Sequence, residues 1–561
     1  MAMSPALLLI GLQMGTRLFT FVLNQALVRL SDPSVYGAAH IHLELLLGIV
    51  LFLSREGIRA ASLRQQSPSS TTAKMSRSTS SNGILALIPI PVGVALAAIA
   101  LPLFTRSSPE LTDRPHFAEV MRLYLASALL ELLSEPIYLH ALSPQGGRNI
   151  ALRVKAEGMA AIAKGGVTLA AIATMQRDQA LLAFGLGQFA YGAVILITFV
   201  GSYVARLGLS TTKDLYIPRR SAATRQKAEA SSSQASTSRL ALSLSIQSIF
   251  KHLLTEADKL AVSRLASLED QGGYALGTNY ASLPLRVLYQ PLEESSRFQF
   301  SSQLGGENDN NNNNKQRSGT KSAKDDERAV SSSLSLLRAL LHLHTYLGLL
   351  LLAFLRPLAK PFILIVSGAQ WVSTSAPRTL AAYAYFLPAL GWAGILEGFL
   401  QSTASESELK RYNSIILASS VTFGLTLWAQ TQTNLVTTEE ALISASTLAM
   451  AVRAAWGWRY ASKFFLARKS SQSISLRDVK PSNATLSALV AAAVINVWVA
   501  STGAGVDGSI SSEHPRSLNA YVPILLTSSS TGLAVLGAIF LFDRASLIQA
   551  LIVIKGSRNS S

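Results

Sequence analysis

The chain has 561 residues, of which 49% are hydrophobic and only 14% are charged, and its formal net charge is +17. Soluble proteins carry about 25% charged residues, so this composition excludes an ordinary soluble enzyme and indicates a membrane protein. The excess of positive charge then predicts basic cytoplasmic loops and an anionic partner, and it predicts no nucleic acid partner. The absence of cysteine excludes disulfides, thiol catalysis and cysteine-bound metals.

Apolar runs recur along the whole sequence at about the 20 residues that a helix needs to cross a bilayer. They predict an all-α polytopic membrane protein with about 14 transmembrane helices, several of which carry polar residues. Such weakly apolar spans are typical of helices that line a water-filled cavity. We expect the spans near residues 6–29, 35–60, 83–104, 117–141, 149–175, 180–205, 240–266, 273–300, 331–355, 379–403, 411–431, 440–466, 484–502 and 519–542.

Three polar segments, 64–82, 219–239 and 305–328, have too little apolar surface to offset the entropy of ordering, so we expect them to be disordered. The basic linker between spans six and seven divides the first twelve spans into two six-helix lobes, a common plan among transporters. No sequence repeat relates the halves, so this division depends on the number of spans. The predicted domains are an N-terminal lobe at 1–206, a cytoplasmic linker at 207–239, a C-terminal lobe at 240–466 with a disordered loop at 302–330, and two further spans with a cytoplasmic tail at 467–561.

The loop cations give the orientation of these spans. Most lysine and arginine residues in the loops fall on the same side as the two termini. The positive-inside rule therefore predicts that both termini are cytoplasmic. The sequons at Asn483 and Asn559 fall on that side, so neither is expected to be glycosylated.

The stretch "SREGIRAASLR" (54–64) follows the apolar run "LLLGIVLFL" without a turn residue, so one helix should continue into the charges. Arg55 and Arg59 are four residues apart and share a helix face, and Glu56 lies three residues before Arg59. Two arginines on one face, with a carboxylate that holds one of them, suit bidentate contact with phosphate oxygens. The alternative is a membrane anchor whose arginines extend to the lipid headgroups.

Charged residues also interrupt spans in both halves of the chain. Charges inside spans are costly, so we expect them to face the bundle interior or a cavity, and the abundance of cations predicts an anionic cargo. Salt bridges between helices are the alternative for any single residue. The candidate binding residues are Arg17, Arg55, Glu56, Arg59, Arg153, Lys251, Glu256, Arg286, Glu293 and Glu294. The candidate kinks for gating lie at Glu135 and Pro136 and at Gln290 and Pro291.

The sequence contains no Walker loop, no zinc-ligand set and no nucleophile–base spacing, so we expect neither catalysis nor a cofactor. A secondary transporter, a passive translocator and a scaffold remain as functional classes.

Four stretches together resemble the Rft family of the endoplasmic reticulum. They are "RLFTFVLNQALVRL" with "LFLSREGIRAASL", then "LLSEPIY", then residues 251–295, and then "LEGFLQSTASESELKRYN". The resemblance runs from about Leu8 to Phe465 and implies the two-lobed, fourteen-helix fold of the multidrug, oligosaccharidyl-lipid and polysaccharide exporter superfamily. The third stretch is the most specific, and Lys251, Glu256, Arg286, Gln290 and Glu293 are among its residues that fit the family pattern.

The resemblance also implies the cargo, which is Man5GlcNAc2 on dolichyl diphosphate, moved from the cytoplasmic to the lumenal leaflet for protein N-glycosylation. Membrane lipids and glycosyltransferases of that pathway are the implied partners. A non-transporting protein that binds this lipid or scaffolds the glycosyltransferases needs the same diphosphate recognition and stays open as an alternative. A small-solute antiporter would have less need of clustered arginines.

Overall fold

The computed structural model describes residues 20–65, 86–107, 109–143, 149–216, 256–304, 323–433, 436–468, 474–504 and 518–559. These residues form α-helices joined by 3-10 and π segments, and no strand occurs among them, so the expectation of an all-helical protein is confirmed. The predicted disordered loop at 302–330 is too long at both ends. Helix α14 continues to Leu304 and α15 begins at Ala323, because the sequence "AKDDERA" consists mainly of strong helix formers.

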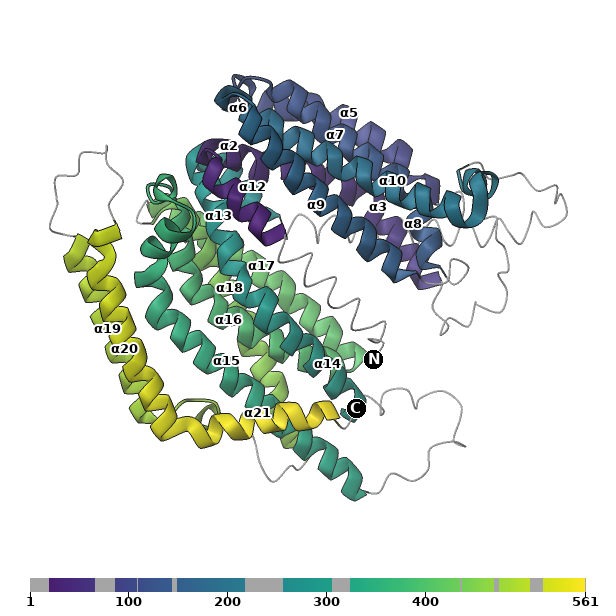
Figure 1. Cartoon of the computed structure of the whole chain (residues 1–561). Helices are drawn as coiled ribbons and strands as arrows, with labels where there is room; N and C mark the ends of the chain where they lie inside the picture. Colours follow the sequence, from purple (N-terminus) through teal and green to yellow (C-terminus); the bar gives the residue numbers. More distant parts are fainter. Residues whose placement is uncertain are drawn as a thin grey trace, which may run out of the picture. The chain divides into compact units, whose positions relative to one another are not determined.

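The chain divides into two compact units, Met1–Gly272 and Gly273–Ser561 (Figure 1). The division falls inside α13 (Leu268–Pro284). Of the predicted linker at 207–239, the first ten residues are described and mostly continue α10, and the rest lies outside the described residues, so the predicted domain ranges stay a prediction. Unit 1 contains helical residues 20–30, α2 (Pro33–Gly37), η1 (Ala38–Leu43), α3 (Glu44–Gln65), α5 (Pro89–Ser107), α6 (Pro109–Thr112), α7 (Phe117–Leu133), α8 (Glu135–Leu142), α9 (Ile150–Thr174), η3 (Arg177–Gln179), α10 (Ala180–Asp214) and α12 (Ala257–Leu265).

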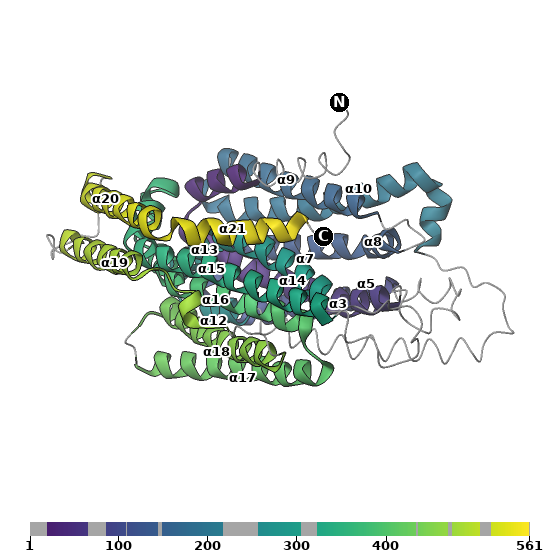
Figure 2. The same cartoon turned by 90° about the horizontal axis from the view of Figure 1, so that it is seen from below.

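Unit 2 begins within α13 and is built around one long helix, α15, with further helices packed on it (Figures 1 and 2). In chain order, the elements are η4 (Leu285–Tyr289), α14 (Gln290–Leu304), α15 (Ala323–Val366), η6 (Ala369–Trp371), α16 (Ala376–Thr403), α17 (Glu406–Thr433), α18 (Thr438–Ala467), η7 (Leu476–Asp478), α19 (Asn483–Ala504), η8 (Leu518–Tyr521), α20 (Val522–Ala538), η9 (Ile539–Asp543) and α21 (Arg544–Asn559).

Helices coincide with every expected span that lies within the described residues, and nine helical runs in that part of the chain are long and apolar enough to cross a membrane. Three expected spans there are helical but are not among the nine, namely α7 with α8, α13 with α14, and α18. These three spans carry Glu131 and Glu135, Glu293 and Arg297, and Arg453. The charges that weaken their apolar character are the ones that build the site described below.

Close approaches through small residues hold unit 1 together. Helix α10 packs on α7 and α9, and a Cβ added at Gly192 would lie 2.7 Å from the backbone oxygen of Ser127. The Ser127 hydroxyl donates a hydrogen bond to the carbonyl of Gln188 at 2.7 Å. Small residues and interhelical hydrogen bonds are the usual means of helix association in lipid, where the hydrophobic effect between helices is weak.

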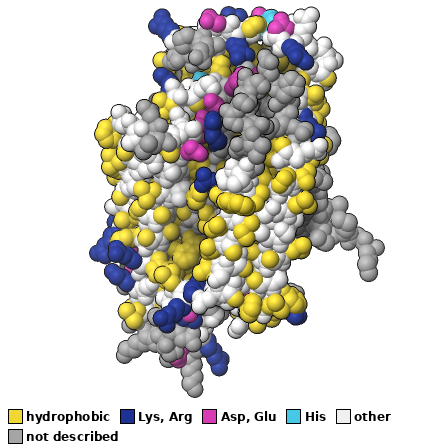
Figure 3. All heavy atoms as spheres, turned by 90° about the vertical axis from the view of Figure 1, so that its left-hand side faces the viewer, with side chains coloured by type: hydrophobic (Ala, Val, Ile, Leu, Met, Phe, Trp, Pro, Cys, Tyr) yellow, Lys and Arg dark blue, Asp and Glu magenta, His cyan; other side chains and the backbone are white. Residues whose placement is uncertain are grey.

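Aromatic packing forms the core of unit 2. Phe399 on α16 meets Phe300 of α14 edge to face at a centroid distance of 5.1 Å and stacks on Phe465 of α18 at 5.3 Å. All three rings are fully buried. On the outside, hydrophobic side chains such as Val494 and Leu533 are exposed. Hydrophobic side chains cover much of the face in Figure 3, as expected of a surface that meets lipid.

A π segment interrupts a long helical run near the start of each unit. In unit 1, η1 separates α2 from α3, and Asp32 caps α2 by accepting a hydrogen bond from the Ser34 N–H at 2.9 Å. In unit 2, η4 separates α13 from α14. Because π segments insert an extra residue into the helical ladder, they redirect the side chains that follow and occur frequently at functional sites.

Two buried polar atoms beside η4 have no hydrogen-bond partner among the described residues. One is the hydroxyl of Tyr289, and the other is Nε2 of His344 on α15. The Nδ1 of His344 lies 2.8 Å from the Leu340 carbonyl, which only accepts, so Nδ1 carries the proton and Nε2 is an acceptor without a donor. The rings pack at 4.8 Å. Each buried polar group without a hydrogen bond costs about 1–3 kcal/mol of folding free energy. The Tyr289 hydroxyl and His344 Nε2 therefore reduce the stability of this packing.

The variant Tyr289→Phe removes the unpaired hydroxyl and keeps the ring, so we expect it to stabilise the folded protein by about 1–3 kcal/mol. The measurement is the midpoint of thermal unfolding in detergent. Tyr280→Phe is the matched control, because the buried Tyr280 hydroxyl is hydrogen bonded to Ser367 at 2.9 Å and its loss should lower the midpoint. A lower midpoint for Tyr289→Phe than for wild type would contradict the interpretation.

Candidate functional site

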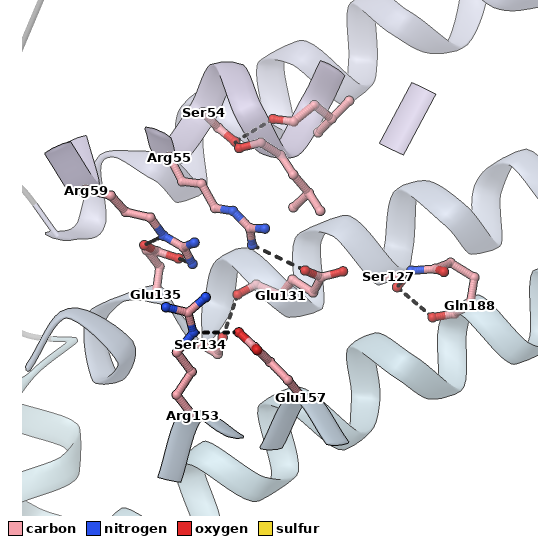
Figure 4. Close-up of polar contacts among 12 residues, drawn as sticks. Ser54, Arg55, Arg59, Ser127, Glu131, Ser134, Glu135, Arg153, Glu157 and Gln188 are labelled. Carbon is pink, nitrogen blue, oxygen red and sulfur yellow. Dashed lines mark hydrogen bonds and ion pairs between the residues drawn. The ribbon is translucent and has the colours of Figure 1, made fainter. Parts of the chain in front are cut away.

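Two arginines of α3 face two glutamates of the neighbouring span in unit 1 (Figure 4). Arg55 and Arg59 are four residues apart on α3. Glu131 lies in the last turn of α7, and Glu135 begins α8. Because residues four apart share a helix face, each arginine meets one glutamate. We call Arg55, Arg59, Glu131 and Glu135 the N-lobe charge cluster.

The two ion pairs of this cluster differ in geometry. Arg59 binds Glu135 through two parallel hydrogen bonds, Nε to Oε1 at 2.6 Å and Nη2 to Oε2 at 2.8 Å, and the Glu135 side chain is fully buried. Arg55 makes one hydrogen bond, from Nη1 to Oε2 of Glu131 at 3.2 Å, and its side chain is 21% exposed. A guanidinium has five N–H donors, so Arg55 keeps the greater capacity for a further acceptor.

Tyr138, one turn after Glu135 on α8, supports the cluster with its ring. The Arg59 guanidinium lies 4.1 Å from the centroid of this ring, and that of Arg153 on α9 lies 5.7 Å away. Arg153 is hydrogen bonded to Glu157 at 2.8 Å, and both side chains are nearly half exposed. Arg59 is therefore fixed by a carboxylate and an aromatic face together, whereas Arg153 lies at the edge of the cluster.

The predicted role of Glu56 is wrong in this structure. Glu56 was expected to hold Arg59 along the same helix, but the carboxylate hydrogen bonded to Arg59 belongs to Glu135. A pair between two helices fixes both partners relative to the bundle, and it also satisfies the buried Glu135, which would otherwise be uncompensated. Glu56 is half-buried on α3 and contributes negative charge near Arg59 without bonding to it.

The helix break that separates α7 from α8 positions the two glutamates. Pro136 has no N–H to continue the helical ladder. Ser134, the residue between the helices, donates its hydroxyl hydrogen bond to the carbonyl of Glu131 at 2.7 Å. The structure therefore breaks the helix beside Glu135 and Pro136.

In unit 2, the predicted kink residues Gln290 and Pro291 begin α14 directly after η4 and are exposed. Gating at either place stays a prediction.

A second group of charges in unit 1 surrounds the end of η1. The Glu44 carboxylate lies 3.0 Å from Nδ1 of His40 and 3.4 Å from Nζ of Lys164 on α9. Its side chain is 31% exposed. This group connects the π segment to α9. It lies at the start of α3, whereas the N-lobe charge cluster lies further along the same helix.

Unit 2 has its own charge cluster, formed by Glu293, Arg297, Glu397 and Arg453, which we call the C-lobe charge cluster. Arg297 bonds to Glu293 on the same helix, α14, at 2.5 Å. Arg453 of α18 binds Glu397 of α16 through two atoms, each at 2.6 Å. Gly398 on α16 makes room for Arg297, because a Cβ there would lie 3.0 Å from the Arg297 Cγ. An ion pair thus joins α16 and α18, while Arg297 of α14 packs beside Gly398 of α16.

The remaining predicted site residues are dispersed. Glu256 pairs with Lys259 one turn later at 2.8 Å. Arg286 and Glu294 are exposed on η4 and α14. Arg17 and Lys251 lie outside the described residues.

Sequence reasoning placed Glu131, Glu397, Arg297 and Arg453 inside spans but did not select them as site residues. A signal for one of them was present. Glu131 and Glu135 repeat the four-residue spacing of Arg55 and Arg59 with the opposite charge. Complementary charges at equal spacing on two spans indicate that these spans pair.

Comparison with solved structures defines the class of protein. The chain shares its fold with "Lipid II flippase MurJ, inward closed conformation", at a TM-score of 0.53 and 11% identity over 95% of this chain and 98% of that one. It also matches an inward-facing multidrug resistance MATE family transporter of the MOP superfamily, at a TM-score of 0.51 and 11% identity over 81% and 96% of the two chains. The fold is therefore one that this chain shares with polytopic membrane proteins.

Comparison of sequences gives the family. The family model described as "Rft-1: Rft protein" matches residues 2–552, and the chain belongs to this family. A relative in Schizosaccharomyces pombe is 30% identical over 74% of each chain, and one in Mus musculus is 30% identical over 73% of each chain. Another, in Candida glabrata, is 25% identical over 96% of this chain and 95% of its own length. All three relatives are named "Man(5)GlcNAc(2)-PP-dolichol translocation protein RFT1".

The geometry predicts that Arg59 and Glu135 stabilise unit 1 as a pair. Arg59→Ala leaves the fully buried Glu135 without its partner, so we expect a loss of about 3–5 kcal/mol in folding stability. Arg55→Ala should cost less, because Arg55 makes a single, longer bond. The measurement is thermal unfolding of purified protein in detergent.

The double variant Arg59→Met with Glu135→Leu serves as the control for this prediction. It removes both charges and keeps apolar volume, so it should recover most of the stability that Arg59→Ala loses. A double variant that is no more stable than Arg59→Ala would show that the two residues do not act as a buried pair.

Proposed function

We propose that this protein moves Man5GlcNAc2 on dolichyl diphosphate from the cytoplasmic to the lumenal leaflet of the endoplasmic reticulum membrane, for protein N-glycosylation. The observation that carries this proposal is family membership over residues 2–552, shared with relatives whose names state this translocation. The fold supports it, because it is also the fold of a lipid II flippase. The protein would act as a transporter and catalyse no covalent step.

Within this proposal, Arg55 is the residue we assign to the diphosphate. It lies inside a membrane span, is partly exposed and uses one hydrogen bond on Glu131. Phosphate oxygens suit a guanidinium because two parallel hydrogen bonds can form. Arg59 has a different task in the same site. Its two bonds to Glu135 hold α3 against α8 and so fix the position of Arg55 one turn away.

Glu131 is proposed to exchange with the diphosphate for Arg55. In the absence of cargo, the carboxylate neutralises an arginine that would be costly to leave unpaired within a membrane span. When the diphosphate binds, it takes over the guanidinium, and Glu131 is released. Binding strength is then the difference between two ion pairs, which allows the cargo to leave again.

The orientation and the surroundings belong to the same proposal. Both termini face the cytoplasm, and the basic end of α3 therefore lies on the side where the cargo enters. The polyprenyl tail stays in the lipid. Glycosyltransferases of the same pathway, which use the dolichyl-diphosphate sugar, are the proposed protein partners.

The experiment that tests the function is reconstitution of purified protein in vesicles that contain labelled Man5GlcNAc2-diphosphate-dolichol. The fraction of sugar that is accessible from outside is followed over time, with protein-free vesicles as the reference. Faster exchange between leaflets in the presence of protein supports the proposal. Exchange at the protein-free rate by a protein that binds the lipid would indicate a non-transporting role in the pathway.

The proposed exchange at Arg55 makes a testable prediction about binding of a dolichyl-diphosphate sugar to purified protein. Each hydrogen bond to a charged group contributes about 1.5–3 kcal/mol, so Arg55→Ala should weaken binding by about tenfold or more. Arg55→Lys should recover only part of this affinity, because an ammonium cannot form two parallel bonds. Glu131→Gln should strengthen binding, since the competing charge is gone.

A folded Arg55→Lys protein with wild-type affinity would instead support the membrane-anchor interpretation. Arg153→Ala is the matched control, because Arg153 is more exposed and bonds to Glu157 on its own helix. We expect it to change affinity less than Arg55→Ala.

Orientation is testable with an inserted glycosylation site. Because the loop cations favour cytoplasmic termini, a sequon inserted at residue 230 should stay unmodified in microsomes. A sequon inserted between α5 and α7, at the opposite ends of the spans, should be glycosylated and is the positive control. Glycosylation at residue 230 would show that the orientation is reversed.

A further inference from the structure

Helix α21 lies at the end of a helical run that is longer than one membrane crossing requires. The apolar helical run that contains it extends over 37 residues, Leu518–Ile554. At 1.5 Å per residue this run would measure about 55 Å if straight, against a hydrocarbon core of about 30 Å. The π segment η9 interrupts the run, and beyond it α21 runs across the direction of α19 and α20 (Figure 1). The part before Arg544 is by itself long enough to cross the membrane.

The junction between span and α21 is fixed by polar contacts. Asp543, the last residue of η9, is buried and accepts hydrogen bonds from the backbone N–H and the hydroxyl of Ser482, at 3.2 and 3.0 Å. Ser546 donates to the Asp543 carbonyl at 2.8 Å. The guanidinium of Arg544 lies 4.9 Å from the ring centroid of Phe540. The turn into α21 is therefore fixed by specific contacts at the end of the span.

Opposite sides of α21 are both apolar. Ala550 is buried, and Val553 and Ile554 pack against the core of unit 2. On the other side, Ile548, Leu551 and Ile552 are exposed, at 44%, 53% and 63%. A helix that lies on a protein surface in water presents polar residues outward, but here three large aliphatic residues are exposed together beside Arg544 and Gln549. Some apolar medium must cover them.

We propose that α21 lies in the plane of the membrane interface, with its inner side on unit 2 and its outer side, Ile548, Leu551 and Ile552, inserted among the lipid acyl chains. The position of α21 identifies lipid as the medium that covers its outer side. The helix continues directly from a transmembrane helix and therefore starts at the depth of the headgroups. Arg544, at its start, is placed to meet lipid phosphates. This inference does not depend on the proposed function.

The absence of cysteine from the chain makes a direct test possible, because every introduced thiol is unique. Leu551→Cys and Ile552→Cys place a fluorescent label on the outer side of α21. Arg477→Cys, on the exposed η7, is the control for water, and Val494→Cys, exposed on α19, is the control for the membrane interior. Labelled proteins are reconstituted in phosphatidylcholine vesicles. Quenching is measured with iodide in the buffer and with nitroxides carried by the lipids.

The labels at 551 and 552 should be quenched by nitroxides near the headgroups and should be several-fold less sensitive to iodide than the label at 477. The label at 494 should respond to nitroxides deep in the acyl chains. Iodide sensitivity equal to that at 477, without lipid quenching, would overturn the proposal in favour of a helix in water. Protection from both quenchers would also overturn it, because it would place a protein surface or a second copy of the chain over α21.

Discussion

The structure depends on one constraint, which is that a charge within a membrane must have a partner. Arg59 and Glu135 illustrate it, since each would be costly alone and together they connect two spans through two short hydrogen bonds. Arg453 and Glu397 connect α18 and α16 through one hydrogen bond and a second ion-pair contact. The spans that carry Glu135 and Arg453 are weakly apolar by themselves, so their place in the bundle is specified by the pairs as well as by packing.

The two units satisfy this constraint with different partners. In unit 1, the second span provides arginine and the fourth provides glutamate beside a proline, Glu135–Pro136. In unit 2, α16 provides the glutamate, Glu397, which is followed by Gly398. Arg297 of α14 bonds within its own helix, and Arg453 of α18 pairs with Glu397. The two units therefore differ in which helices their ion pairs connect.

The helices could be predicted from the sequence, but the partners in the ion pairs between helices could not. Spans could be predicted because their length and apolar character are local properties, and the break at Pro136 is also local. Arg55 and Arg59 could be placed on one face from their spacing alone. Their partners could not be, because contacts between residues 76 positions apart depend on which helices pack together, and the neighbouring Glu56 was chosen in error. Helix α21 was expected to be a tail, since the sequence does not reveal how the chain turns after Asp543.

Neutralisation of the arginines has a consequence for the proposed transport. A site with unpaired arginines would bind a diphosphate strongly, but it would also hold it, and the empty site would leave costly charges within the membrane. In this site Glu131 already accepts a hydrogen bond from the Arg55 guanidinium. The diphosphate would bind more weakly here, because its hydrogen bond to Arg55 replaces an existing one. Weak exchange favours release on the far side, and a carboxylate that returns to the arginine stabilises the empty protein. The carboxylates that reduce affinity for the cargo are thus the groups that would make repeated turnover possible.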